Sequence, residues 1–152
     1  MKTTLVDTGP LVAFLNRRDR HHQWAVDTMA NLRPPLLTCE AVLSEAIYLV
    51  RAIPHGGDAV MELLERGMVR GVFRLEEEAT AVRRLLKKYG DVPMDLADAC
   101  LVRMTEVYAD PLVVTVDTDF RDVYRRHGRA LIPTTMPGGA TKTARKGRGP
   151  TA

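Results

Sequence analysis

The sequence predicts an α/β fold in which a central parallel sheet of about five strands carries helices on both faces. Short runs of apolar and β-branched residues alternate with segments whose apolar side chains recur every three or four positions. A helical pattern separates each expected strand from the next, which favours parallel pairing. The chain of 152 residues is long enough for one domain with one hydrophobic core.

The expected strands are short apolar segments bounded by turn or capping residues, at positions 2–6, 36–38, 68–75, 112–116 and 129–132. The expected helices lie between or after them, at positions 10–16, 21–32, 39–51, 58–66, 76–89, 96–102 and 120–126. Pro10 opens the first helix, with Gly9 as the expected capping residue. Asp95 fits the N-terminal cap of the helix at 96–102.

Charge is distributed unevenly along the chain. The net charge is +3, but segment 137–152 contains four basic residues and no acid. Positions 1–136 hold 18 basic and 19 acidic residues, a net charge of −1. We expect a folded domain over 1–136 and a basic, disordered tail over 137–152. Such a tail can contact phosphates, although a purely solvated tail explains the composition equally well.

The cysteines and the apolar runs bear on the location of the protein. Cys39 and Cys100 lie in apolar helical segments, and no Cys/His cluster has zinc-ligand spacing. Unpaired thiols are typical of the reducing cytoplasm. The N-terminus contains no long apolar run, so we expect neither a signal peptide nor a membrane span and predict a cytoplasmic protein.

Asp7 and Asp117 each follow an apolar strand. In an open parallel sheet, groups at the carboxyl ends of the strands face the ligand crevice. Both carboxylates are therefore expected at the functional edge of the sheet. Helix capping is the structural alternative for Asp7, but Gly9 stands closer to the expected helix start at Pro10.

Glu45 and Asp98 lie on expected helices among apolar neighbours. The residues three and four positions away from Glu45 are Ala41, Val42, Tyr48 and Leu49. From Leu96 to Val102, every residue except Asp98 is apolar. An ionised carboxylate in such surroundings is unfavourable unless it is paired or bound to a metal. Conflicts of this kind tend to mark functional sites.

Carboxylates brought together without Lys or Arg repel one another, so they need a cation or raised pKa values. Sites made of oxygen ligands alone select Mg²⁺, with Mn²⁺ as a possible substitute. Mg²⁺ held by few carboxylates and several waters is typical of phosphoryl transfer. The sequence therefore predicts a Mg²⁺ site formed by Asp7, Glu45, Asp98 and Asp117.

The four carboxylates lie in the segments 5–13 (LVDTGPLVA), 42–45 (VLSE), 95–99 (DLADA) and 115–120 (TVDTDF). In this order the segments resemble PIN domains, and more narrowly the VapC class of ribonuclease toxins from type II toxin–antitoxin systems. The resemblance extends over residues 3–133. It implies a three-layer fold and a Mg²⁺-dependent endoribonuclease that hydrolyses RNA phosphodiester bonds. Asp7, Glu45, Asp98 and Asp117 match the acidic quartet of the family, and Asp119 is a further candidate ligand.

The resemblance also implies roles and partners. Asp7 and Asp98 would hold the principal Mg²⁺, while Glu45 and Asp117 would bind it directly or through water. Glu45 is also a candidate base that orients the attacking water. Thr115 is a candidate hydrogen-bonding residue within the site. The implied partners are an RNA substrate, a cognate antitoxin protein and a second copy of the chain in a homodimer.

Other functions remain open at this stage. One is a catalytically inactive RNA-binding or partner-binding module on the same fold. Another is a phosphatase with an aspartyl nucleophile that uses Asp117 and Asp119. An exposed basic face is expected on the helix at 76–89, from Arg83, Arg84, Lys87 and Lys88. This face can meet RNA, but a solvated helix surface is its default interpretation.

Overall fold

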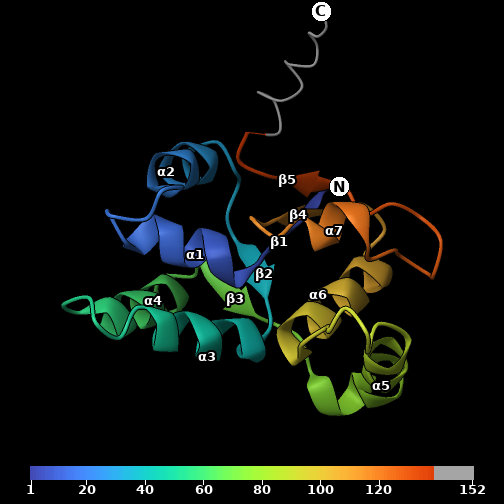
Figure 1. The fold of residues 1–152 in the computed structure, drawn as a ribbon. Coiled ribbons are helices and arrows are strands. Elements are labelled where there is room, and N and C mark those ends of the chain that lie inside the picture. Colours follow the sequence, from blue (N-terminus) through green and yellow to red (C-terminus); the bar gives the residue numbers. More distant parts are fainter. Residues whose placement is uncertain (139–152) are drawn as a thin grey trace, which may run out of the picture.

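Within residues 1–138, which the computed structural model describes, five parallel strands form one sheet in the order β3-β2-β1-β4-β5 (Figure 1). The strands are β1 (Thr3–Val6), β2 (Leu36–Thr38), β3 (Val69–Gly71), β4 (Pro111–Val114) and β5 (Thr134–Thr135). In the register of the central strands, Leu5 pairs with Leu37 on one side and with Val113 on the other. The predicted parallel sheet is confirmed.

The helices pack in two groups. They are α1 (Thr8–Leu15), α2 (His22–Ala30), α3 (Glu40–Leu49), α4 (Gly56–Glu65), α5 (Ala79–Lys88), α6 (Leu96–Val107) and α7 (Asp119–Asp122), with a 3₁₀ turn, η1 (Leu75–Glu78), before α5. Helix α1 packs against α2, α3 and α4, whereas α5 packs against α6, which contacts β1 and β4. Helices α1–α4 lie on one side of the sheet and α5–α7 on the other (Figure 1). This is expected for right-handed connections, because the chain moves across the sheet from β1 to β3 and then continues on the other side of β1 with β4 and β5.

The core lies between the sheet and these helices. Leu5 and Val6 of β1 and Val113 of β4 are completely buried. Phe120 and Tyr124 are also completely buried, and their rings meet edge to face with centroids 5.1 Å apart. Burying each such side chain contributes about 1.5–3 kcal/mol. This packing fixes the segment after β4 against the sheet.

The largest differences from the predicted strands concern the third and the last strand. The last strand is Thr134–Thr135 rather than 129–132, because residues 126–130 form a tight turn closed by an antiparallel bridge between Arg126 and Ala130. The third strand is limited to Val69–Gly71, and the following Val72 and Phe73 pack against the core outside the sheet. Of the predicted tail, all but Pro137 and Gly138 lies outside the described residues.

A close approach between α1 and the end of β4 explains Gly9. A β-carbon at this position would overlap the Cγ2 atom of Val116. Glycine therefore allows the start of α1 to lie directly beside the segment that carries Asp117. As for membranes, none of the helices found up to residue 138 combines the length and apolar character needed to cross a bilayer.

Candidate active site

The site residues gather where the strand order reverses. Strand β1 lies between β2 and β4, and the chain leaves β1 toward β2 but returns to its other side as β4. Such switch points open a crevice at the carboxyl ends of the strands. Asp7 follows β1 directly and Thr115 follows β4 directly, so both residues lie at this crevice.

Asp7 is held at both carboxylate oxygens. Its side chain is only 7% exposed. The Thr8 backbone N–H donates to Oδ1 at 2.8 Å, and the Thr115 hydroxyl donates to Oδ2 at 2.7 Å. Asp7 is also the N-cap of α1, so the predicted cap at Gly9 is wrong. Asp7 therefore both caps α1 and belongs to the group of site carboxylates.

Two threonines extend this arrangement to the neighbouring carboxylates. The Thr8 hydroxyl donates to Glu45 Oε1 at 2.9 Å. The Thr115 hydroxyl accepts the backbone N–H of Asp117 at 2.9 Å. Hydrogen bonds therefore link Asp7 to Glu45 on α3 and to the backbone of Asp117 after β4. Thr8 was not predicted as a site residue, although its hydroxyl stands directly beside a strand-end aspartate in the sequence.

Asp98 reaches the site from the first turn of α6. Asp95 caps this helix as predicted, because its Oδ1 accepts the Asp98 backbone N–H at 2.8 Å. The Tyr124 hydroxyl donates to Asp98 Oδ2 at 2.9 Å. Tyr124 was likewise not predicted as a site residue, because no local pattern in the sequence indicates it.

Asp119 has a less central position. Its backbone N–H donates to Asp117 Oδ1 at 2.9 Å, and Thr118 rather than Asp119 is the N-cap of α7. Burial raises the pKa of Asp119, and repulsion from Asp117 and Asp122 raises it further. Asp119 therefore lies beside the cluster of the other carboxylates, next to Asp117 and at the start of α7.

Burial and mutual repulsion disfavour ionisation of two of the carboxylates. Burial raises the pKa of Asp7 to about 6, against the hydrogen bonds from Thr115 and Thr8, and Asp117 and Glu45 raise it further by repulsion. Burial likewise raises the pKa of Asp98 to about 7. Repulsion from Asp95, Asp7 and Asp117 adds to this shift, while the Tyr124 hydrogen bond opposes it.

The donor set fits a hard divalent cation. Among residues 1–138, none of Asp7, Glu45, Asp98 or Asp117 forms an ion pair with Lys, Arg or His. In the same part of the chain, one oxygen of each of Glu45, Asp98 and Asp117 accepts no protein hydrogen bond. Uncompensated carboxylates with available oxygens are the ligands that Mg²⁺ prefers.

In the described part of the chain, protein side chains alone do not form a complete coordination shell for a metal ion. As the side chains stand, no three His, Cys, Asp or Glu residues of the described chain are grouped closely enough to hold a metal ion together. Mg²⁺ usually keeps several of its waters and is bound by one or two carboxylates. The residues present therefore fit a Mg²⁺ ion that is held partly through water.

The comparison with known families identifies the fold to which this site belongs. The PIN domain profile matches residues 4–126. The chain belongs to the PIN domain family. This PIN domain is 28% identical to Ribonuclease VapC26 of Mycobacterium tuberculosis over 133 residues, which cover 85% of the chain and 92% of the relative. The predicted resemblance to PIN domains of the VapC class is confirmed.

A solved structure shares the same fold. The crystal structure of VapC20 from Mycobacterium tuberculosis, a toxin that cleaves the sarcin-ricin loop, matches this PIN domain with a TM-score of 0.68. The match covers 77% of the chain and 92% of VapC20, at 21% sequence identity. The three-layer, PIN-like fold predicted from the sequence is therefore confirmed.

Proposed function

We propose that this PIN domain is a Mg²⁺-dependent endoribonuclease and the toxin component of a toxin–antitoxin pair. The observation that carries the proposal is the hydrogen-bonded linkage from Glu45 through Thr8, Asp7 and Thr115 to Asp117, at the switch point of the sheet. The likeness to Ribonuclease VapC26 supports RNA as the substrate.

In this proposal Asp7 and Asp98 hold the ion, and Glu45 and Asp117 complete its surroundings directly or through water. A bound Mg²⁺ would supply an acidified water and stabilise negative charge on the scissile phosphate. Thr8 and Thr115 keep the Asp7 carboxylate in one orientation. Thr8 also fixes one oxygen of Glu45, which leaves the other oxygen to orient the attacking water as a base.

The proposed products are a 5′-phosphate and a 3′-hydroxyl. The proposed partners are a cognate antitoxin that blocks the crevice and a second copy of the chain in a homodimer. The proposed location is the cytoplasm, in keeping with the two free, buried cysteines.

RNA cleavage by the purified chain tests the proposal. With Mg²⁺ present, the wild type is expected to cleave RNA, and excess EDTA is expected to abolish cleavage. Asp98→Asn should lose the activity while keeping the fold, as judged by circular dichroism. Asp58→Asn is the matched control, because Asp58 is an exposed acid at the start of α4.

Cleavage that persists in EDTA, or full activity in Asp98→Asn, would overturn the proposal. RNA binding without any cleavage in Mg²⁺ or Mn²⁺ would favour the inactive binding module instead.

A further inference from the structure

We propose that α5 and the turn at 126–130 form a surface that binds the phosphate backbone of the RNA outside the cleavage site. This inference rests on the proposed ribonuclease function. The basic surface is defined by Arg83, Arg84, Lys87 and Lys88 of α5 and by Arg129 of the turn, all of which are exposed. Residues 1–138 carry 18 basic and 19 acidic residues, so the surface is a local concentration of charge rather than a general excess.

The basic residues of α5 share one side of the helix. Arg83, Arg84, Lys87 and Lys88 are all exposed, and they are spaced as i, i+1, i+4 and i+5. This spacing places them on one side of an α-helix. Val82 and Leu85 are buried on the opposite side. Within the described chain, none of the four cations is paired with an acid.

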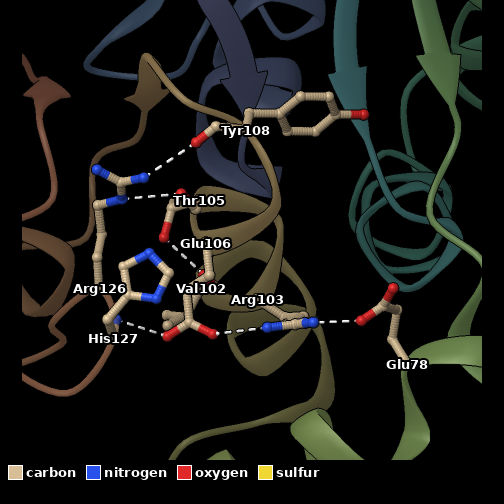
Figure 2. Close-up of polar contacts among 8 residues, drawn as sticks. All are labelled: Glu78, Val102, Arg103, Thr105, Glu106, Tyr108, Arg126 and His127. Atoms are coloured by element: carbon tan, nitrogen blue, oxygen red, sulfur yellow. Dashed lines mark hydrogen bonds and ion pairs between the residues drawn. The ribbon is translucent and has the colours of Figure 1, made fainter.

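The turn at 126–130 is fixed to α6 (Figure 2). The Arg126 guanidinium donates to the carbonyls of Thr105 at 2.8 Å and Tyr108 at 3.0 Å. The Glu106 carboxylate accepts the His127 backbone N–H at 2.8 Å. The Arg103 guanidinium donates a second hydrogen bond to the Glu106 carboxylate, at 3.2 Å. The turn that carries Arg129 is therefore held in place before any ligand binds.

This turn lies beside α5. The Lys88 ammonium is 3.3 Å from the position that a β-carbon at Gly128 would take. The backbone N–H of Arg125 donates to the Tyr89 hydroxyl at 3.1 Å. A groove of about 390 Å³ separates the two elements, and Arg84, Lys88 and His127 are among its lining residues. Its one acid, Glu106, is already paired with Arg103.

The basic surface adjoins the candidate active site. The Tyr89 ring, at the end of α5, meets the Tyr124 ring edge to face with centroids 5.1 Å apart. The Tyr124 hydroxyl contacts Asp98. Two buried aromatic side chains, Tyr89 and Tyr124, therefore lie between the end of α5 and a proposed Mg²⁺ ligand, and an RNA strand bound at the crevice can span this distance to reach the basic surface.

The composition of α5 favours a nucleic acid over a protein partner. Protein interfaces are centred on Trp, Tyr and Arg and are depleted in Lys, and α5 contains no aromatic residue. Phosphate contacts come largely from Arg and Lys. None of the exposed large hydrophobic side chains of the described chain lies on α5. A polyanion whose charges lie on a continuous backbone matches such a surface.

RNA binding in EDTA tests the inference without cleavage. The variant replaces Arg83, Arg84, Lys87 and Lys88 by Gln, which is nearly as favourable in helices. The matched control replaces four exposed arginines elsewhere, Arg17, Arg18, Arg33 and Arg70, by Gln, so both proteins have the same net charge. The binding constant for a labelled RNA of about 30 nucleotides is measured by fluorescence anisotropy at several KCl concentrations. The salt slope is the magnitude of the slope of log K against log [KCl], to which each phosphate contact with a single strand contributes about 0.7.

The α5 variant should bind about 10–100-fold more weakly, with a salt slope smaller by about 2–3, whereas the control should change by less than about threefold. An unchanged slope in the α5 variant, or an equal loss in the control, would overturn the inference. Cleavage is measured separately on a four-nucleotide substrate, which should be cut equally well by the α5 variant and the wild type. If no protein cleaves RNA in Mg²⁺, the proposed function fails, while the binding result still decides the role of the surface.

Discussion

The hydroxyl of Tyr124 donates a hydrogen bond to Asp98 across 2.9 Å, joining two residues that lie 26 positions apart in the chain. Tyr124 is completely buried, so this bond fixes the orientation of the Asp98 carboxylate from inside the core. Groups that orient metal ligands in this way typically change metal affinity or activity by about 10–100-fold when they are removed.

Tyr124→Phe removes only the hydroxyl and keeps the ring packing against Phe120 and Tyr89. We expect the rate of RNA cleavage to fall by about 10–100-fold at a subsaturating Mg²⁺ concentration and to recover partly at a high one. The pKa of Asp98 should rise, because the Tyr124 hydrogen bond lowers it. A Mg²⁺ titration of the cleavage rate checks this, and a variant with an unchanged Mg²⁺ dependence would contradict it.

Thr115 is expected to act through its hydroxyl group. Thr115→Val keeps the shape of the side chain but removes the bond to Asp7 and the acceptor of the Asp117 backbone N–H. The pKa of Asp7 should then rise above about 6, and the free energy of unfolding should fall by about 1–3 kcal/mol. Thr115→Ser retains the hydroxyl and is the control. Equal cleavage and equal thermal stability in the two variants would rule out this role.

The stability of the metal-free protein should depend on the ionisation of Asp98. Its pKa is about 7 in the folded chain, above the ordinary value of 3.8, so the folded state binds the proton more tightly than the unfolded state. The stabilisation is complete below pH 3.8 and is lost as the pH rises through 7. Because this carboxylate is partly exposed, we expect a loss of about 1–2 kcal/mol rather than the full value of the shift.

Asp98→Asn should therefore leave the metal-free protein more stable than the wild type at pH 8, with a smaller difference at pH 4. Urea denaturation in EDTA measures both values. The control Asp58→Asn should show no such pH-dependent gain, and a gain in Asp98→Asn that does not vary with pH would contradict the explanation.

The start of α1 should tolerate no side chain at position 9. Gly9→Ala places a methyl group against Val116, and overpacking of this kind reduces the free energy of unfolding by about 1–3 kcal/mol. Gly57→Ala in α4 is the control, because its β-carbon would lie 3.6 Å from Ile47, an ordinary contact. Chemical denaturation should show a lower free energy of unfolding for Gly9→Ala only. Equal free energies of unfolding for Gly9→Ala and Gly57→Ala would contradict this prediction.

The sequence predicted those features that depend on local pattern. Asp7 and Asp117 follow apolar strands, and helices alternate with the strands, so the sheet and the edge at which these two carboxylates lie could be deduced from the pattern of the sequence. The strand at 129–132 was misplaced because β5 has two residues, too few to show a period. The contact between Tyr124 and Asp98 could not be predicted, since it arises from the packing of α6 against the segment after β4.

The cap of α1 shows a different limit. Asp7 and Gly9 both suit the start of a helix, and the sequence favoured Gly9 because Pro10 follows it. The helix begins at Thr8, because Asp7 caps it. Gly9 lies inside the helix, where the close approach of Val116 leaves no room for a side chain. Close approach between distant segments, which the local pattern does not record, determines this boundary.

The central claim is that the carboxylates of the candidate site together bind a divalent cation, and Mn²⁺ titration followed by electron paramagnetic resonance tests it most directly. The wild type and Asp58→Asn are expected to bind Mn²⁺ at or below about millimolar concentration, and Asp7→Asn is expected to bind at least about tenfold more weakly. Absence of Mn²⁺ binding to the wild type at millimolar levels, or equal binding by Asp7→Asn, would contradict the claim.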